Sequence, residues 1–175
     1  MSADFAAKLL VRALIWVLPA YVANATPVVT VRLYRHRGKL HPIDGGLTLQ
    51  DGRRLLGENK TWEGFLGGLL GGTAASMALD YLGLHSFPEG VTLSFGALLG
   101  DLLGAFIKRR LGLAPGAPAP LLDQLDFLFG GLLLHSLLFG PVDLQTLAVL
   151  ILVTPLIHWA TNAAAFLLGL KQHPW

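Results

Sequence analysis

The stretch Leu144–Leu170, LQTLAVLILVTPLIHWATNAAAFLLGL, contains no lysine, arginine, aspartate or glutamate. It exceeds the roughly 20 apolar residues with which an α-helix crosses the hydrocarbon core of a bilayer. Four further apolar stretches reach a comparable length, and they are Phe5–Val31, Trp62–Leu82, Val91–Ile107 and Leu121–Phe139. The sequence therefore predicts an all-α integral membrane protein of about five transmembrane helices, forming one bundle and one catalytic domain over residues 1–175.

The composition excludes a water-soluble protein. Hydrophobic residues make up 53% of the 175 and charged residues only 14%, and the mean hydropathy is +0.58. A soluble domain carries about a quarter charged residues. A pI near 9.2 would suggest nucleic acid in a soluble chain. Here we expect membrane lipids and no nucleic acid as partners, because basic residues follow the sidedness of a membrane protein. The absence of cysteine excludes disulfides and thiolate chemistry.

The basic residues gather in two of the four connections. The segment 32–61 between the first two spans carries seven lysines and arginines, and the segment 108–120 between the third and fourth begins Lys-Arg-Arg. The other two connections have none, and Lys171 follows the last span. The positive-inside rule places both basic connections and the C-terminus in the cytoplasm and the N-terminus outside. We expect a multi-pass protein of the cell membrane whose active site faces the cytoplasm.

Glycines recur in the second span at a spacing of four. Gly64, Gly68 and Gly72 form two overlapping Gly-x-x-x-Gly patterns. Small residues at this spacing let two membrane helices approach closely. The pattern predicts tight packing of this helix and leaves open whether two copies form a homodimer through it.

Three aspartates interrupt the apolar spans near the basic connections. Asp101 lies six residues before Ile107, and Asp123 and Asp126 lie just after the start of the returning span. An ionisable group inside a membrane normally faces a partner or a polar cavity, and an i, i+3 spacing places the last two acids on one helix face. Three carboxylates without cysteine or paired histidine favour Mg²⁺. The alternative is that they form structural ion pairs with the basic run at 108–110.

The segment before the second span indicates an anion site. It reads Gly-Glu-Asn-Lys-Thr-Trp-Glu-Gly-Phe from Gly57 to Phe65, so a lysine stands beside the free backbone amides of a helix N-terminus. Ordinary capping by Thr61 and Glu63, with Lys60 as a membrane anchor, explains the spacing equally well. Arg53 and Arg54 upstream are able to hold phosphate bidentately, although a plain cytoplasmic loop would look similar. We interpret His135 and His158 as packed polar residues.

The motifs resemble those of a known family. Lys-Thr-Trp-Glu-Gly-Phe at 60–65, Gly-Asp at 100–101 with Lys-Arg at 108–109, and Leu-Asp-Gln-Leu-Asp at 122–126 are similar in order and placement to elements of the CDP-diglyceride synthetases. The resemblance spans about two-thirds of the chain. Pro-Ile-Asp-Gly-Gly at 42–46 and the run 51–61 most resemble the archaeal branch, the CDP-archaeol synthases. Gln124 departs from a basic residue of the family motif, and Ala-Pro-Gly-Ala-Pro at 114–118 departs from its His-Gly-Gly.

The resemblance implies a CTP-dependent cytidylyltransferase of archaeal ether phospholipid synthesis. Its substrates would be CTP and digeranylgeranylglyceryl phosphate, an isoprenoid glycerol phosphate lipid, and its products CDP-archaeol and pyrophosphate. It implies that Asp101, Asp123 and Asp126 are catalytic and hold Mg²⁺, and it leaves open a second cation such as K⁺. It further implies basic and polar groups around the nucleotide phosphates, with Lys108 catalytic. The substrate-binding residues would be Arg53, Arg54, Asn59, Lys60, Thr61, Glu63 and Arg109.

Three other functions are weaker interpretations. A CDP-alcohol phosphotransferase would show Ala-Arg after its Asp-Gly pair and two further acids four apart, whereas Asp51-Gly52 is followed by Arg-Arg-Leu-Leu and Asp123 and Asp126 are three apart. An ion or substrate transporter using intramembrane carboxylates is the main alternative, but transporters place polar groups near the midplane and carry inverted repeats. A structural membrane subunit would need no buried acids.

Overall fold

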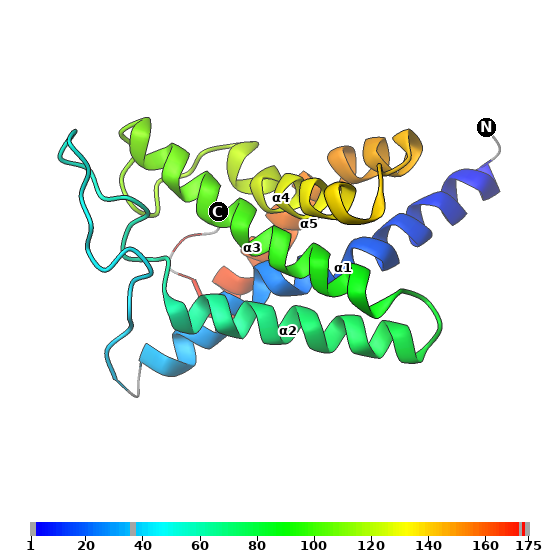
Figure 1. Cartoon of the computed structure of the whole chain (residues 1–175), viewed down its shortest axis with the longest axis horizontal. Helices are drawn as coiled ribbons and strands as arrows, with labels where there is room; N and C mark the ends of the chain where they lie inside the picture. Colours follow the sequence, from blue (N-terminus) through cyan, green and yellow to red (C-terminus); the bar gives the residue numbers. More distant parts are fainter. Residues whose placement is uncertain (1–2, 36–37, 172, 174–175) are drawn as a thin grey trace.

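The computed structural model describes residues 3–35, 38–171 and 173, and the described residues form five helices without a named strand. Figure 1 shows their arrangement. The predicted all-helical fold is therefore confirmed. The helices are α1 (Ala3–Arg35), α2 (Trp62–Tyr81), α3 (Phe87–Arg110), α4 (Leu122–Phe139) and α5 (Leu144–Leu167).

Two helices extend further than their apolar stretches predict. The structure continues α1 to Arg35 and α3 to Arg110, because basic residues stabilise the last turn of a helix by compensating its dipole. Asp101 therefore lies nine residues before the end of α3, or about 13.5 Å at 1.5 Å per residue. The site is deeper in the helix than the apolar boundary at Ile107 suggests.

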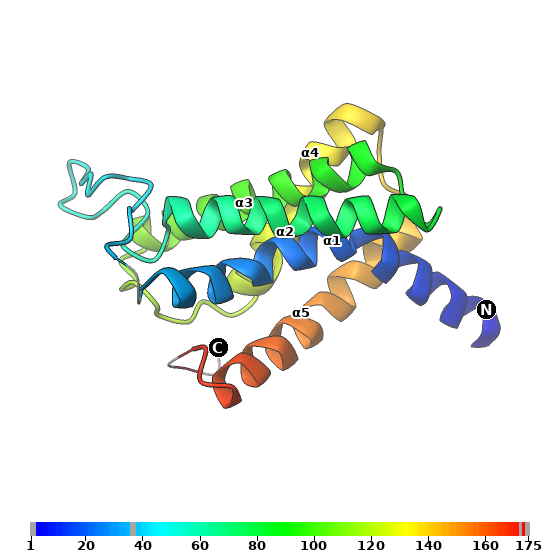
Figure 2. The ribbon, with the colours of Figure 1, turned by 90° about the horizontal axis from the view of Figure 1, so that it is seen from below.

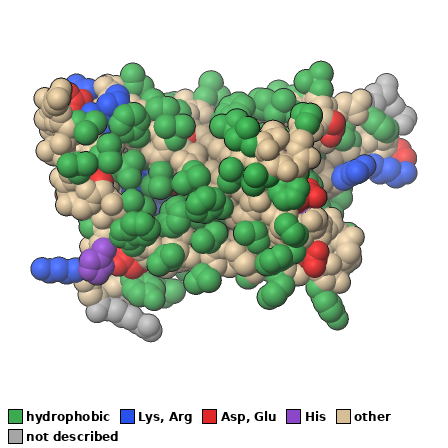
Figure 3. All heavy atoms as spheres, viewed as in Figure 1, with side chains coloured by type: hydrophobic (Ala, Val, Ile, Leu, Met, Phe, Trp, Pro, Cys, Tyr) green, Lys and Arg blue, Asp and Glu red, His purple; other side chains and the backbone are tan. Residues whose placement is uncertain are grey.

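Four of the five helices, α1, α3, α4 and α5, are long and apolar enough to cross a membrane. The remaining helix, α2, has 20 residues, but its many glycines lower its hydropathy. The chain is a multi-pass membrane protein. Hydrophobic side chains cover the middle of the molecule, while most charged ones lie toward its two ends (Figure 3). The α1–α2 and α3–α4 connections lie at the same end (Figure 1), as the distribution of basic residues predicts.

Helices α3 and α4 pack backbone against backbone through glycines. A Cβ atom on Gly96 would lie 2.6 Å from the carbonyl oxygen of Gly130, which no side chain tolerates. A Cβ on Gly100 would likewise collide with the carbonyl of Asp126. Close approach of this kind needs small residues at the interface. It brings the acid of α3, Asp101, beside the acids of α4.

The glycine face of α2 packs within the chain. A Cβ on Gly68 would lie 2.6 Å from the carbonyl oxygen of Ala23 in α1, and Gly72 lies against Ser94 of α3. The predicted tight packing is confirmed, and its partners are α1 and α3. A homodimer would therefore need a surface other than these glycines.

The fifth helix diverges from the layer formed by the others (Figure 2). It is fastened to α1 where the hydroxyl groups of Tyr21 and Thr154 lie 2.6 Å apart. Thr154 is fully buried, as is Leu150 one turn earlier. The outer face of α5 remains exposed, with Leu152 and Leu156 among its exposed side chains.

Candidate active site

The site begins with a charged contact between the loop before α2 and the middle of α3. Lys60 Nζ lies 2.6 Å from Oδ1 and 2.6 Å from Oδ2 of Asp101. A small cavity of about 50 Å³ opens beside it, lined also by Asn59 and Thr61. The sequence places these four residues in two distant motifs, and the fold brings the motifs together.

A second lysine and aspartate pair joins α3 to the start of α4. Lys108 Nζ donates to Oδ1 of Asp123 at 2.5 Å, and the other carboxylate oxygen accepts the backbone N–H of Ala119 at 2.7 Å. The backbone enters α4 through Leu121, whose φ of 66° is the one positive value among the described non-glycine residues. This conformation costs energy for a side chain with a Cβ. The turn that places Asp123 is therefore strained.

Asp126 lies between these two pairs. Its Oδ1 accepts the N–H of Phe127 at 2.6 Å, and its side chain lies against Gly104 of α3. The charges of Asp101, Lys60 and Asp123 all act on it. The ion pairs of the described residues do not include Asp126. Three carboxylates thus share two ammonium groups.

The three acids do not converge on one point. Among residues 3–35, 38–171 and 173, no group of three or more histidine, cysteine, aspartate or glutamate side chains is arranged to hold a metal ion. Asp101 and Asp123 each form an ion pair with a lysine instead. Of the ion pairs with residues 108–110 that the alternative interpretation expected, the structure contains Lys108–Asp123, whereas Asp101 pairs with Lys60. Magnesium binding by the three acids stays a prediction.

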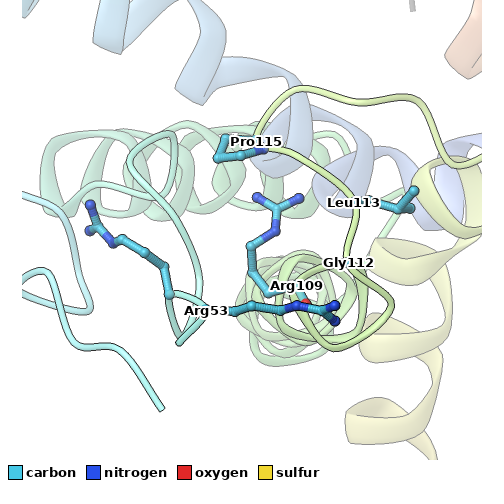
Figure 4. A pocket seen from close by; sticks show the side chains of 6 residues that line it. Arg53, Arg109, Gly112, Leu113 and Pro115 are labelled. Atoms are coloured by element: carbon cyan, nitrogen blue, oxygen red, sulfur yellow. The ribbon is translucent and has the colours of Figure 1, made fainter. Parts of the chain in front are cut away.

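The predicted arginines gather around a separate cavity. Arg53, Arg54 and Arg109 line a space of about 190 Å³ together with Pro115. Figure 4 shows the guanidinium group of Arg109 pointing toward Pro115. Arg109 is only 6% exposed, and its Nη2 donates to the carbonyl of Ala114 at 2.9 Å. Its buried Nε has no hydrogen-bond partner in the part of the chain that the structure describes. A buried cation with an unused donor makes this cavity suited to an anion.

Two of these arginines also hold the loop together. Arg53 Nη1 donates to the carbonyl of Arg110 at 2.7 Å, which satisfies a carbonyl group left free at the end of α3. Arg110 in turn reaches both carboxylate oxygens of Asp51 at 2.9 Å. Arg54 pairs with Asp44 and, at 3.6 Å, with Glu58. The segment 51–54 is thereby fastened onto the end of α3, beside Lys108.

Asp44 organises the loop from its centre. Its side chain is completely buried, and it accepts hydrogen bonds from the backbone of Gly46, Leu56 and Gly57 at 3.1, 3.0 and 3.0 Å and from the guanidinium group of Arg54. Burial raises the pKa of Asp44, but these donors lower it by more, so that its pKa lies well below the usual value. The sequence signalled the turn through Asp-Gly-Gly but not the role of its carboxylate.

Thr61 and Glu63 act first on the start of α2. Thr61 is the N-cap, and its hydroxyl accepts the N–H of Gly64 at 3.2 Å. Glu63 binds His41, with 2.6 Å between Oε1 and Nδ1 and 3.1 Å between Oε2 and the backbone nitrogen. Thr61 also lines the cavity next to Lys60. Glu63 is directed toward the loop instead.

Sequence reasoning missed the position of His158 on α5 relative to the acids. The charges of Asp123, Asp101 and Lys108 act on His158, whose ring stacks on Phe127 at 6.2 Å between ring centroids. The sequence predicts His158 to be a packed polar residue, and the stacking confirms that. Its nearness to the acids could not be read from spacing, because α5 carries no aspartate, glutamate, lysine or arginine.

Comparisons with known proteins show the family of this chain. A family model described as CarS-like CDP-archaeol synthase matches residues 6–175. The chain belongs to the CDP-archaeol synthase family. A CDP-archaeol synthase of Thermofilum pendens is 55% identical over 167 residues, which cover 94% of this chain and 80% of the relative. A CDP-archaeol synthase of Aeropyrum pernix is 43% identical, and the match covers 100% of this chain and 98% of the relative.

A solved structure has the same fold. It is described as an intramembrane enzyme for archaeal membrane lipid biosynthesis, with a TM-score of 0.75 and 43% sequence identity. The match covers 86% of this chain and 92% of that one. Membership of the CDP-archaeol synthase family confirms the resemblance found in the motifs and the expectation of a nucleotidyltransferase. Nothing in the comparisons supports the transporter alternative.

Proposed function

We propose that this chain joins CTP to an isoprenoid glycerol phosphate, such as digeranylgeranylglyceryl phosphate, and releases pyrophosphate. The observation that carries the proposal is the gathering of Lys60, Asp101, Lys108, Asp123 and Asp126 at one end of the bundle. Two anionic substrates must meet there, and their phosphates repel one another. A site that supplies paired acids and ammonium groups meets that requirement.

The nucleotide would occupy the loop side of the cluster. In this position, the ammonium groups of Lys60 and Lys108 can exchange the carboxylates of Asp101 and Asp123 for phosphate oxygens. The buried Nε of Arg109 offers a donor to the outer phosphates, with Arg53 and Arg54 lining the same cavity. Asn59 and Thr61 add hydrogen-bonding groups beside Lys60. We assign Glu63 a supporting role through His41.

The reaction needs no dedicated base. A phosphate monoester is already ionised near neutral pH, so its oxygen attacks the α-phosphorus of CTP directly. The bond to the bridging oxygen breaks, and its electron pair leaves with pyrophosphate. The lysines of this chain stabilise the charge that develops on both sides of the transferred phosphorus.

The chemistry of the three acids, although not their arrangement among the described residues, also suits a divalent cation. Three carboxylates are opposed by two paired lysines, and hard oxygen ligands of this kind suit Mg²⁺. Asp101, Asp123 and Asp126 are the residues that would hold it. A bound Mg²⁺ would neutralise charge on both phosphates and orient them. A second, monovalent cation such as K⁺ stays a prediction, and we assign no residues to it.

We further propose that the site faces the cytoplasm, where CTP is made. The basic connections lie at the site's end of the molecule, and positive residues favour that side of a membrane.

The position of the label in the product tests the reaction. Purified protein in mixed micelles receives Mg²⁺, digeranylgeranylglyceryl phosphate and CTP labelled with ³²P at either the α or the γ phosphate. The proposal predicts that α label enters the lipid and γ label leaves as pyrophosphate. Label from both positions in the lipid, or from neither across a range of lipid phosphates, would refute it.

A further inference from the structure

Three polar residues at the end of α5 form a connected chain. Lys171 Nζ donates to Asn162 Oδ1 at 2.8 Å. Asn162 Nδ2 lies 3.0 Å from Nδ1 and 3.2 Å from Nε2 of His158. His158 and Asn162 are four residues apart and share one face of the helix. The chain runs from the C-terminal segment into the membrane-spanning part of α5.

The chemistry of the donors determines the orientation of the amide. An ammonium group only donates, so the oxygen of Asn162 must face Lys171 and its nitrogen must face the imidazole, which accepts. Asn162 is 9% exposed, so both of its polar groups are satisfied inside the protein. Polar groups inside a membrane are energetically costly, and where they occur they normally have a function. Asn162 holds the ammonium of Lys171 in a defined place.

That place adjoins the ionic cluster of the active site. The ring of His158 stacks on Phe127, which follows Asp126 directly. The charges that act on Lys171 are those of Asp123, Lys60 and Lys108. Burial lowers the pKa of Lys171, and partial desolvation of an ammonium group strengthens its attraction to an anion.

The two sides of the cluster differ in what they meet. Lys60 lies in the α1–α2 connection and Arg109 in the last turn of α3, at the end of the bundle where a water-soluble nucleotide arrives. Helix α5 instead presents apolar side chains outward, with Leu152 73% and Leu156 69% exposed. A lipid whose chains stay in the bilayer approaches along such a face. Its phosphate can therefore reach the polar residues at the end of α5 from the membrane side.

We propose that Lys171 binds the phosphate group of the lipid substrate and that Asn162 is a positioning residue for it. The proposal rests on the cytidylyl transfer proposed above. It divides the cations of the site between two anions. Lys60, Lys108 and Arg109 serve the triphosphate, while Lys171 serves the attacking phosphate monoester. His158 completes the support by accepting from Asn162 and packing on Phe127.

The Michaelis constants for the two substrates distinguish this assignment from a structural role. We expect Lys171→Met to raise the KM for the lipid phosphate about 10-fold, the loss of one charge-assisted contact, and to leave the KM for CTP unchanged. Lys171→Arg should restore most of the affinity because it keeps the charge. Asn162→Ala should raise the same constant by about 5-fold, and less than additively with Lys171→Met.

A matched control is Lys8→Met. It removes a lysine that is 77% exposed and paired with Asp4, near the N-terminal end of α1 and away from the site. It should change neither constant. A change confined to the KM for CTP, or no change in either constant, would overturn the assignment to the lipid phosphate. Equal changes in both constants together with a lower melting temperature would reveal a structural residue and overturn it too. Absence of label transfer by the unmodified protein would instead refute the proposed function itself.

Discussion

Lys60 Nζ contacts both carboxylate oxygens of Asp101 at 2.6 Å, and this contact links the loop before α2 to the interior of α3. Both side chains keep access to solvent, at 24% and 29% exposure. Partly exposed pairs contribute little to stability, on the order of 1 kcal/mol. The Lys60–Asp101 contact can therefore break when substrate binds with little loss of folding stability.

Replacing either partner should affect catalysis far more than stability. We expect Lys60→Met and Asp101→Asn each to lower kcat/KM by about 100-fold, because each removes a group that acts on phosphate in the transition state. The double variant should be little worse than the singles, since the residues act as a unit. Steady-state assays and thermal melts in detergent measure both properties. A melting temperature that falls in step with activity would contradict this interpretation.

Asp126 depends on the absence of a side chain at residue 104. A Cβ on Gly104 would collide with the carboxylate of Asp126, which is able to move, whereas a Cβ on Gly100 would collide with the backbone of α4, which is not. Gly104→Ala should therefore lower kcat by about 10-fold with little loss of stability, as expected for a misplaced catalytic group. Gly100→Ala should mainly lower the melting temperature.

The control for both substitutions is Gly38→Ala, because a Cβ there meets nothing within 4 Å. It should leave activity and melting temperature unchanged. Equal loss of stability in Gly104→Ala and Gly100→Ala would show that the contact with Asp126 is ordinary packing.

The buried carboxylate of Asp44 makes the loop sensitive to acid. Its pKa in the folded protein lies well below the usual value, so the unfolded state takes up a proton first as the pH falls. Stability from Asp44 is complete above the ordinary aspartate pKa of about 4 and is lost progressively below it. Asp44→Asn should lower the melting temperature at pH 7 by about 5 °C.

Asp44→Asn should also show a smaller difference in melting temperature between pH 7 and pH 3 than the unmodified protein. Asp4→Asn is the matched control, because Asp4 is 74% exposed in its pair with Lys8. It should behave like the unmodified protein. A full acid dependence retained in Asp44→Asn would show that other carboxylates govern it.

Arg109 should serve the nucleotide. Its guanidinium group is buried and its Nε has no hydrogen-bond partner among the described residues, so a phosphate oxygen would satisfy it. We expect Arg109→Lys to raise the KM for CTP about 10-fold, since lysine lacks the planar fork of arginine, and to leave the KM for the lipid unchanged. Arg12→Lys, far from the site on α1, should alter neither constant. A rise confined to the KM for the lipid would contradict this role.

Much of this architecture could be predicted because membrane helices are long and apolar. The apolar run Leu144–Leu170 predicts α5 without knowledge of any packing partner. Four of the five helices are apolar enough for hydropathy to predict them as membrane spans, and α2 is less hydropathic. The same signal could not place their ends, because the lysine and arginines at 108–110 continue α3 rather than stopping it. Helix ends depend on capping and charge, which apolar periodicity does not report.

The site was predictable in its residues but not in its pairing. Spacing along the chain brings Asp123 and Asp126 together, yet the choice of Lys60 for Asp101 depends on how the α1–α2 loop folds. That fold is set by Asp44, which reads in the sequence as an ordinary turn residue. The contribution of α5 was equally hidden, because His158 and Asn162 acquire their neighbours only when α5 packs beside Phe127.

The most direct test of the central claim compares two carboxylates at opposite ends of the bundle. Transfer of ³²P from α-labelled CTP to lipid is measured for the unmodified protein, Asp126→Asn and Asp143→Asn. Asp143 caps α5 by accepting the N–H of Thr146 at 2.9 Å, a role that asparagine fills equally well. The account predicts labelled lipid from the unmodified protein and Asp143→Asn, and at least about 100-fold less from Asp126→Asn. Undiminished transfer by a folded Asp126→Asn variant would contradict it.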